Sequence, residues 1–105
     1  MNVRLVESLA EAIAALPDED YALFQDSLTA KLVKRTPGVA GGHACIRDTR
    51  IAVWTLISLM QQGADDRELG LNFPGLTRFD FVTARAYYDA HREEIEATIA
   101  DHDRE

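Results

Sequence analysis

The strongest constraint on the fold is a series of helix signals between residues 53 and 95. Apolar residues at helical spacing end at Gly63, a residue suited to the left-handed conformation that closes a helix. Asp65 precedes a short helical segment and has Glu68 three residues later, which is the spacing of a capping box. Thr77 begins a longer helix with a similar cap. This order of three helices, with a tight turn before the last, predicts a helix-turn-helix-like core.

The last of these helices is expected to be one long helix. Residues on or beside one face continue the helical spacing: Phe81, Val82, Ala84, Ala86, Tyr88, His91, Ile95 and Ile99. In a helix-turn-helix the second helix of the motif can enter a DNA major groove. Thr77 and the first N–H groups of the helix are placed to meet phosphate, while Arg78 and Arg85 lie two turns apart and reach bases or backbone. The same packing also builds small cores that never contact DNA.

Residues 1–35 predict a helical hairpin. Two apolar stripes at helical spacing cover residues 5–16 and 21–32, with Pro17 between them. Each helix is too short to be stable alone. The hairpin must therefore pack on the rest of the chain or on the same hairpin of another subunit, and we expect it to be an oligomerisation element.

A short β-hairpin is predicted between the two helical regions. A glycine-rich linker over residues 36–42 leads to two β-prone runs, 44–46 and 49–53, on either side of Arg47 and Asp48. The strands are too short to stand alone and need a neighbouring strand. The predicted class is therefore mainly α, with a three-helix core, a short β-hairpin and an N-terminal helical hairpin.

Composition indicates a soluble protein of one domain's size. The chain has 105 residues, of which 47% are hydrophobic and 28% charged, and its net charge is −7. No apolar run reaches the roughly 20 residues that a membrane span needs. The N-terminus lacks a secretory pattern, and the single Cys45 cannot form an internal disulfide, so we expect a cytoplasmic protein. Residues 31–50 carry a net charge of +4 and the remainder −11, which gives a basic middle and an acidic tail.

No set of residues predicts catalysis. His43, His91 and His102 share no metal-ligand spacing with Cys45 or with each other. A nucleophile pair of Cys45 and His43 would lack a third group to orient it. We therefore expect no enzyme activity, no metal site and no cofactor.

The segment GGHACIRDTRIAVW, residues 41–54, resembles the signature of the domain-of-unknown-function-433 family. That signature has a glycine-glycine step followed by Pro-x-Ile-Arg-Gly-Thr-Arg-Ile-Pro-Val. Further matches lie at residues 62–64, 73–77 and 86–95, so the resemblance covers about residues 36–95. Members of this family look like VapB-like antitoxins, which neutralise a PIN-like ribonuclease toxin and bind their own promoter DNA.

The resemblance implies an antitoxin-like regulator with two domains, a helical hairpin over residues 1–35 and a helix-turn-helix-like antitoxin domain over residues 36–105. The protein would be a homodimer or higher homo-oligomer, with one recognition helix from each subunit. The implied DNA contacts are Arg47, Arg50, Thr77, Arg78 and Arg85. A PIN-like toxin holds Mg²⁺ with a cluster of acids, so the implied toxin contact is an arginine, Arg92 or Arg104, that enters this site.

The alternative is a homodimeric protein-interaction module that never contacts DNA and dimerises through residues 5–32. The pI near 4.8 favours this alternative, because DNA-binding proteins draw much of their affinity from phosphate neutralisation. The chain also departs from the family signature, since Asp48 replaces a glycine and Ala44 and Ala52 replace two prolines. An acid between Arg47 and Arg50 partly cancels the charge of the basic turn.

Overall fold

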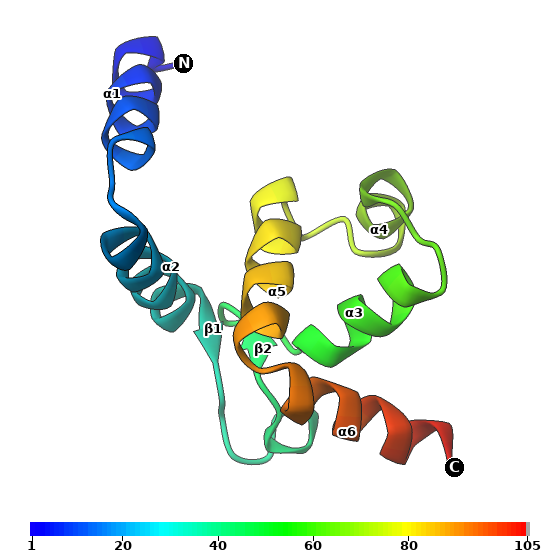
Figure 1. Cartoon of the computed structure of the whole chain (residues 1–105). Helices are drawn as coiled ribbons and strands as arrows, with labels where there is room; N and C mark the ends of the chain where they lie inside the picture. Colours follow the sequence, from blue (N-terminus) through cyan, green and yellow to red (C-terminus); the bar gives the residue numbers. More distant parts are fainter. Residues whose placement is uncertain (105) are drawn as a thin grey trace.

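The computed structural model describes residues 1–104; Glu105, the last residue of the predicted second domain, lies outside them. The fold is mainly helical with one two-stranded antiparallel sheet, which confirms the predicted class (Figure 1). The elements in chain order are α1 (Val3–Ala14), α2 (Asp18–Leu32), β1 (Val33–Lys34), the 3₁₀ helix η1 (Ala40–Gly42), β2 (Cys45–Ile46), α3 (Val53–Gln61), α4 (Asp66–Asn72), α5 (Arg78–Ala90) and α6 (Arg92–Asp103).

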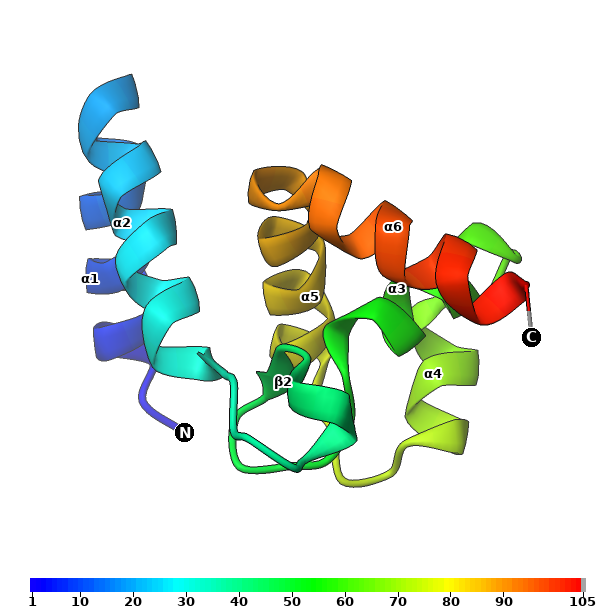
Figure 2. The same ribbon diagram turned by 90° about the horizontal axis from the view of Figure 1, so that it is seen from below.

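The hydrophobic core lies where α3, α5 and α6 pack together. Leu56 of α3, Phe81 of α5 and Ile95 of α6 are almost completely buried there, and Leu69 of α4 joins them. Helix α5 is central, because α2 packs against it on one side and α3 on the other. The two views agree on this position, with the N-terminal helices on one side of α5 and α3 and α4 on the other (Figure 2).

The helix caps predicted between residues 63 and 80 are confirmed. Asp65 accepts a hydrogen bond from the backbone N–H of Glu68 at 2.9 Å and is the N-cap of α4. Thr77 and Asp80 form a complete capping box at the start of α5. Gly63 has φ +102° just after α3, so its lack of a Cβ permits the left-handed turn into α4.

The prediction of one long last helix is wrong, because the chain breaks into α5 and α6 at His91. This residue has φ −132° and ψ 40° and follows the last residue of α5. The turn carries Ile95 and Ile99 back onto the core, where they are buried. An unbroken helix over residues 78–103 would be about 39 Å long, so both isoleucines would project past α3. Burial of these two side chains therefore favours the break.

The predicted turn at Arg47 and Asp48 is present, and the neighbouring strand that it needs is β1. The register pairs Val33 with Ile46 and Lys34 with Cys45. The run after the turn pairs with β2 only through an isolated bridge between Cys45 and Ala52. The sheet thus joins the end of the N-terminal helical segment to the loop before α3.

The two predicted N-terminal helices form, with Pro17 as the N-cap of α2. Helix α1 nevertheless extends past the beginning of α2 and away from the core (Figure 1). Within residues 1–104 it buries none of its residues, whereas α2 packs on α5. None of the described helices is both long enough and apolar enough to cross a membrane.

Candidate functional site

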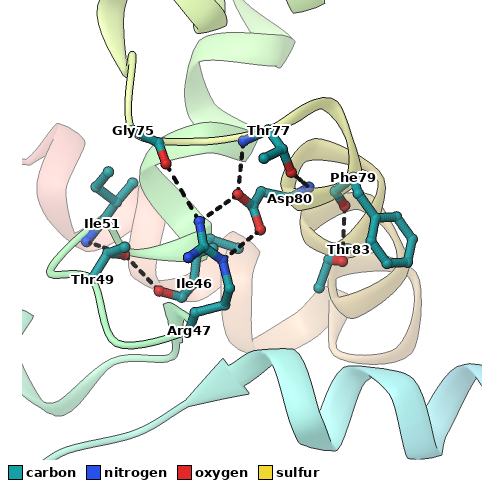
Figure 3. Close-up of polar contacts among 9 residues, drawn as sticks. All are labelled: Ile46, Arg47, Thr49, Ile51, Gly75, Thr77, Phe79, Asp80 and Thr83. Atoms are coloured by element: carbon teal, nitrogen blue, oxygen red, sulfur yellow. Dashed lines mark hydrogen bonds and ion pairs between the residues drawn. The ribbon is translucent and has the colours of Figure 1, made fainter. Parts of the chain in front are cut away.

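Arg47 meets two residues that lie 30 and 33 positions later in the sequence, Thr77 and Asp80, at the amino end of α5 (Figure 3). Arg47, in the turn after β2, donates from Nε to Oδ1 of Asp80 at 3.0 Å and from Nη2 to Oδ2 at 2.7 Å. Asp80 also accepts from the backbone N–H of Thr77 at 2.8 Å, and the Thr77 hydroxyl accepts from the N–H of Asp80 at 3.2 Å. The guanidinium of Arg47 is therefore held by the carboxylate of the α5 capping box.

The two side chains of this ion pair differ in their exposure to solvent. The Asp80 side chain is 4% exposed, while that of Arg47 is 40% exposed. The hydrogen bonds from Arg47 lower the pKa of Asp80, although burial acts in the opposite direction. The same contact raises the pKa of Arg47. Both groups are therefore charged at neutral pH, and the buried carboxylate is fully satisfied by its partners.

Arg47 reaches Asp80 from a left-handed backbone conformation. Its φ is +46°, a conformation that residues with a Cβ rarely adopt. Its Nη2 also donates to the carbonyl oxygen of Gly75 at 3.4 Å. Asp48, the next residue, is not among the residues with positive φ, so glycine is not required at that position. The Asp48 carboxylate instead accepts a hydrogen bond from Nζ of Lys34 at 2.7 Å.

The other two predicted DNA contacts near this end are exposed. Arg78 is the first residue of α5, directly after Thr77, and Arg50 follows the turn that holds Arg47. Neither arginine forms an ion pair with any residue in the range 1–104. Arg50 also lines a shallow depression of ≈ 240 Å³ with Lys34, Arg47 and the thiol-bearing Cys45. The structure therefore gathers four predicted contacts here, two of them engaged and two exposed.

Arg85, the fifth predicted DNA contact, lies two turns further along α5 and is paired with an acid of the same chain. Its Nη2 donates to Oδ1 of Asp66 at 2.6 Å, which joins α5 to the first turn of α4. Both side chains are about half exposed, so the pair adds little stability. The ion pair does remove most of the local positive charge from this part of α5.

The outer surface of α5 is apolar where it faces the N-terminal helices. Phe79 and Val82 are 50% and 51% exposed. They line a groove of ≈ 210 Å³ together with side chains of the N-terminal helices and of α5: Ile13, Tyr21, Phe24, Gln25, Leu28, Thr29, Thr83 and Ala86. Sequence reasoning missed Phe79 as a surface residue. The sequence carries no local signal for its exposure, because Thr83, one turn later on the same side of α5, is buried.

The predicted toxin contacts, Arg92 and Arg104, are at opposite ends of α6. Arg92 lies over the ring of Tyr88, 4.8 Å from its centroid, and is 3.5 Å from the carboxylate of Asp89. Arg104 is the C-cap of α6 and lies 3.7 Å from Asp101. Their side chains are 63% and 79% exposed. Both ion pairs are loose contacts at the surface, where such pairs contribute little free energy.

A polar cluster at the corner between α5 and α6 was not predicted from the sequence. The Tyr87 hydroxyl donates to Oε2 of Glu94 at 2.7 Å, and Arg35 donates to both Tyr87 and Glu94. Burial and the hydrogen bond to Glu94 raise the pKa of Tyr87 to about 12. Burial raises the pKa of Glu94, but the hydrogen bonds from Tyr87 and Arg35 outweigh it and lower that pKa. No local pattern signals this cluster, because Arg35 is 52 and 59 positions from its partners.

The residues weighed for catalysis are dispersed or engaged in packing. His102 stacks on Trp54 with ring centroids 4.0 Å apart, and His43 meets His102 edge-on at 6.3 Å. His91 stacks on Tyr87. Burial raises the pKa of the Cys45 thiol, which makes it a poor nucleophile at neutral pH. Within residues 1–104 no three His, Cys, Asp or Glu side chains are grouped so as to hold a metal ion.

Comparison with known proteins finds a protein family whose matched region contains the Arg47–Asp80 pair. The family described as "Protein of unknown function (DUF433)" matches residues 33–88, which is more than half of the chain. The chain belongs to the DUF433 family. The DUF433 match begins at β1 and ends within α5, so it contains Arg47, Thr77 and Asp80 but neither α1 nor the arginines of α6.

A solved structure supports the same family. The crystal structure of a DUF433 member protein from Anabaena variabilis is similar to this chain, with 48% sequence identity and a TM-score of 0.65. The similarity covers 95% of this chain and 99% of that one. It therefore extends over the N-terminal helices and α6, beyond the region of the family match. No curated protein matches the chain significantly.

Proposed function

We propose that this DUF433 protein is an antitoxin-like regulator that binds and neutralises a PIN-like ribonuclease toxin through protein contacts. It acts by binding, catalyses no reaction and needs no cofactor. Its place of action is the cytoplasm, where a ribonuclease toxin meets its RNA substrates. An arginine of α6 enters the acidic metal site of the toxin and neutralises the charge that would otherwise hold Mg²⁺.

The observation that carries this proposal is a contrast between two sets of polar residues. Three of the five residues that would contact DNA, Arg47, Thr77 and Arg85, are bound to Asp80 or Asp66 of the same chain, with the two arginine side chains 40% and 46% exposed. Arg92 and Arg104, which would contact a protein partner, have only loose surface ion pairs. A guanidinium in a loose pair can be transferred to a partner's carboxylates at little cost. The contrast favours contact with an acidic protein site over contact with phosphate.

Only one of the two arginines can enter a single metal site. They are twelve residues apart on one helix, which places them about 18 Å apart along its axis. Arg92 is held by its contact with the Tyr88 ring, whereas Arg104 lies at the end of α6 and is the more exposed of the two. Arg104 is therefore the residue that enters the site, and Arg92 contacts the rim.

Co-expression with the product of the neighbouring gene, followed by pull-down and a ribonuclease assay, tests this proposal. The wild-type chain should co-purify with a small acidic-cluster nuclease and inhibit it. Arg104→Ala should weaken inhibition by about 30-fold, the loss typical of a buried arginine anchor. Arg92→Ala should weaken it less. Arg67→Ala is the matched control, because Arg67 is an exposed arginine on α4 without an ion pair to residues 1–104. Full inhibition by the Arg104→Ala, Arg92→Ala double variant would refute the proposal.

Promoter binding at the amino end of α5 is a second candidate function. The specific observation in its favour is that Arg50 and Arg78 are exposed and unpaired beside the Arg47 turn, as described above. Titration of a promoter fragment at two salt concentrations measures it, since affinity from phosphate contacts falls steeply with salt. Replacing both arginines with alanine should reduce the slope of log K against log salt concentration by about 2. If no fragment binds at low salt, the chain is an interaction module that does not contact DNA.

A further inference from the structure

Helix α1 has an apolar face that no other residue in the range 1–104 covers. Leu5, Val6 and Leu9 are 53–62% exposed, and at 100° per residue they point to one side of the helix. The three charged residues of α1, Arg4, Glu7 and Glu11, point to the other side. A monomer that places such a helix in water gains nothing from its apolar face, because a helix of this length is marginal without packing.

This face continues into the groove between the N-terminal helices and α5. Ile13, one turn after Leu9 on the same stripe, lines that groove with Tyr21, Phe79 and Val82. The α1 face and the groove therefore form one continuous apolar surface, called here the α1–α5 surface. It contains the side chains of Leu5, Val6, Leu9, Ile13, Tyr21, Phe24, Leu28, Phe79, Val82 and Ala86.

The chain carries both halves of a helix-in-groove contact. One half is an amphipathic helix without an internal partner, and the other is an apolar groove open to the surface. In a two-fold symmetric dimer, α1 of each copy would fill the groove of the other copy, so that both helices and both grooves would be covered. We propose that the α1–α5 surface is a homodimer interface in which α1 of each copy packs on this surface of the other copy.

The exposed area agrees with what a dimer needs. Six of these side chains are 42–62% exposed, so the surface is an apolar patch of roughly several hundred Å², the size at which an exposed patch marks an interaction site. Burial of such a patch on each of two copies approaches the ~1,200 Å² at the lower limit for a specific and stable protein interface. A partner that covered only α1 or only the groove would leave the other half in water.

Charge also selects a second copy as the occupant. The whole chain has a net charge of −7, but residues 1–16 contain only Arg4, Glu7 and Glu11 as charged side chains. None of these three lies on the apolar face, so two such faces can meet without like-charge repulsion. The surface also offers no cationic residue for phosphate and no cluster of charge for a strongly charged protein.

Light scattering coupled to size-exclusion chromatography of the full chain tests the interface. At about 100 μM the wild type should be a dimer, because interfaces near this size reach micromolar affinity. Leu9→Asp and Phe79→Asp should each weaken dimerisation at least about 10-fold, since each places a carboxylate in the apolar contact. Circular dichroism should show a folded core, with a loss of helix signal no larger than the contribution of α1, because both side chains are exposed in the single chain and α1 is marginal without packing.

Leu71→Asp is the matched control. Leu71 is 72% exposed on α4, outside the α1–α5 surface, so this variant should remain a dimer. A monomeric wild type at about 100 μM, well above micromolar affinity, would overturn the proposal. So would a dimer that Leu9→Asp leaves intact, or one that Leu71→Asp dissociates. A dimer that is lost with Leu9→Asp but kept with Phe79→Asp would show that the groove takes no part. Toxin inhibition is measured separately through Arg104, so the two proposals can fail independently.

Discussion

Replacing Asp80 with alanine should destabilise the fold, because it removes a buried carboxylate that holds both an arginine and part of a helix cap. Asp80 is 97% buried by residue area, as its 3% exposure shows, and it accepts three hydrogen bonds, two from Arg47 and one from the N–H of Thr77. Loss of the Asp80 half of the capping box, which is its hydrogen bond from the Thr77 N–H, costs about 1 kcal/mol. Loss of the charge-assisted pair costs about 2 kcal/mol, because the half-exposed Arg47 regains water. The expected total is about 3 kcal/mol.

Thermal unfolding followed by circular dichroism at pH 7 measures this loss. In a chain of about 100 residues each kcal/mol changes Tm by about 4 °C, so Asp80→Ala should lower Tm by about 12 °C. Asp80→Asn keeps an oxygen for the Thr77 N–H but loses the ion pair, and should lower Tm by a smaller amount. Asp48→Asn is the matched control, because it removes a surface ion pair in which the Lys34 and Asp48 side chains are 53% and 87% exposed, and it should leave Tm close to the wild-type value.

The pH dependence gives an independent check on the same pair. The pKa of Asp80 in the folded chain lies below its ordinary value of 3.8. Its stabilising effect is therefore complete above pH 3.8 and is lost as the pH falls through the lower folded value. The difference in stability between wild type and Asp80→Ala should shrink in acid. If both Asp80 variants unfold at the Tm of Asp48→Asn at pH 7, then Arg47 and Asp80 do not hold the β2–α3 turn to α5.

Two further predictions test the α5–α6 corner and the helix ends. The pKa of Tyr87 is raised from 10 to about 12, so its protonated phenol contributes stability below pH 10 that is lost as the pH rises to 12. In denaturant unfolding, Tyr87→Phe should therefore lose less stability than the wild type between pH 10 and pH 12. In an absorbance titration, the same variant should lack the phenol that ionises last. Gly63→Ala should cost about 1 kcal/mol because φ is +102° there, whereas Gly70→Ala inside α4, which has no neighbour within 4 Å of the added Cβ, should stabilise by about 0.5–1 kcal/mol. Equal Tm changes of the same sign at the two glycines would contradict the conformational explanation.

The helix boundaries from residue 53 to residue 80 were predictable because their causes are local. A capping oxygen, an N–H three residues away and a glycine with positive φ all lie within one turn of each other. The break at His91 was not predictable in this way. No side-chain N-cap hydrogen bond or glycine marks it, and the helical spacing of apolar residues continues through it. The burial of Ile95 and Ile99 against α3 favours the break, and that contact exists only in the folded chain.

In the candidate site too, the local features were predictable from the sequence and the long-range contacts were not. The sequence alone indicated the basic turn, the Thr77 cap and the family to which the chain belongs, because each depends on residues that are adjacent or regularly spaced. It did not indicate that Arg47 would bind Asp80, 33 positions away, or that Arg35 would bind Tyr87 and Glu94. Those pairings depend on how α5 packs between α2 and α3. Tertiary structure thus decided which predicted cations are paired within the chain and which are exposed to solvent, since an ion pair depends on the distance between two charges in space and not on their separation in the sequence.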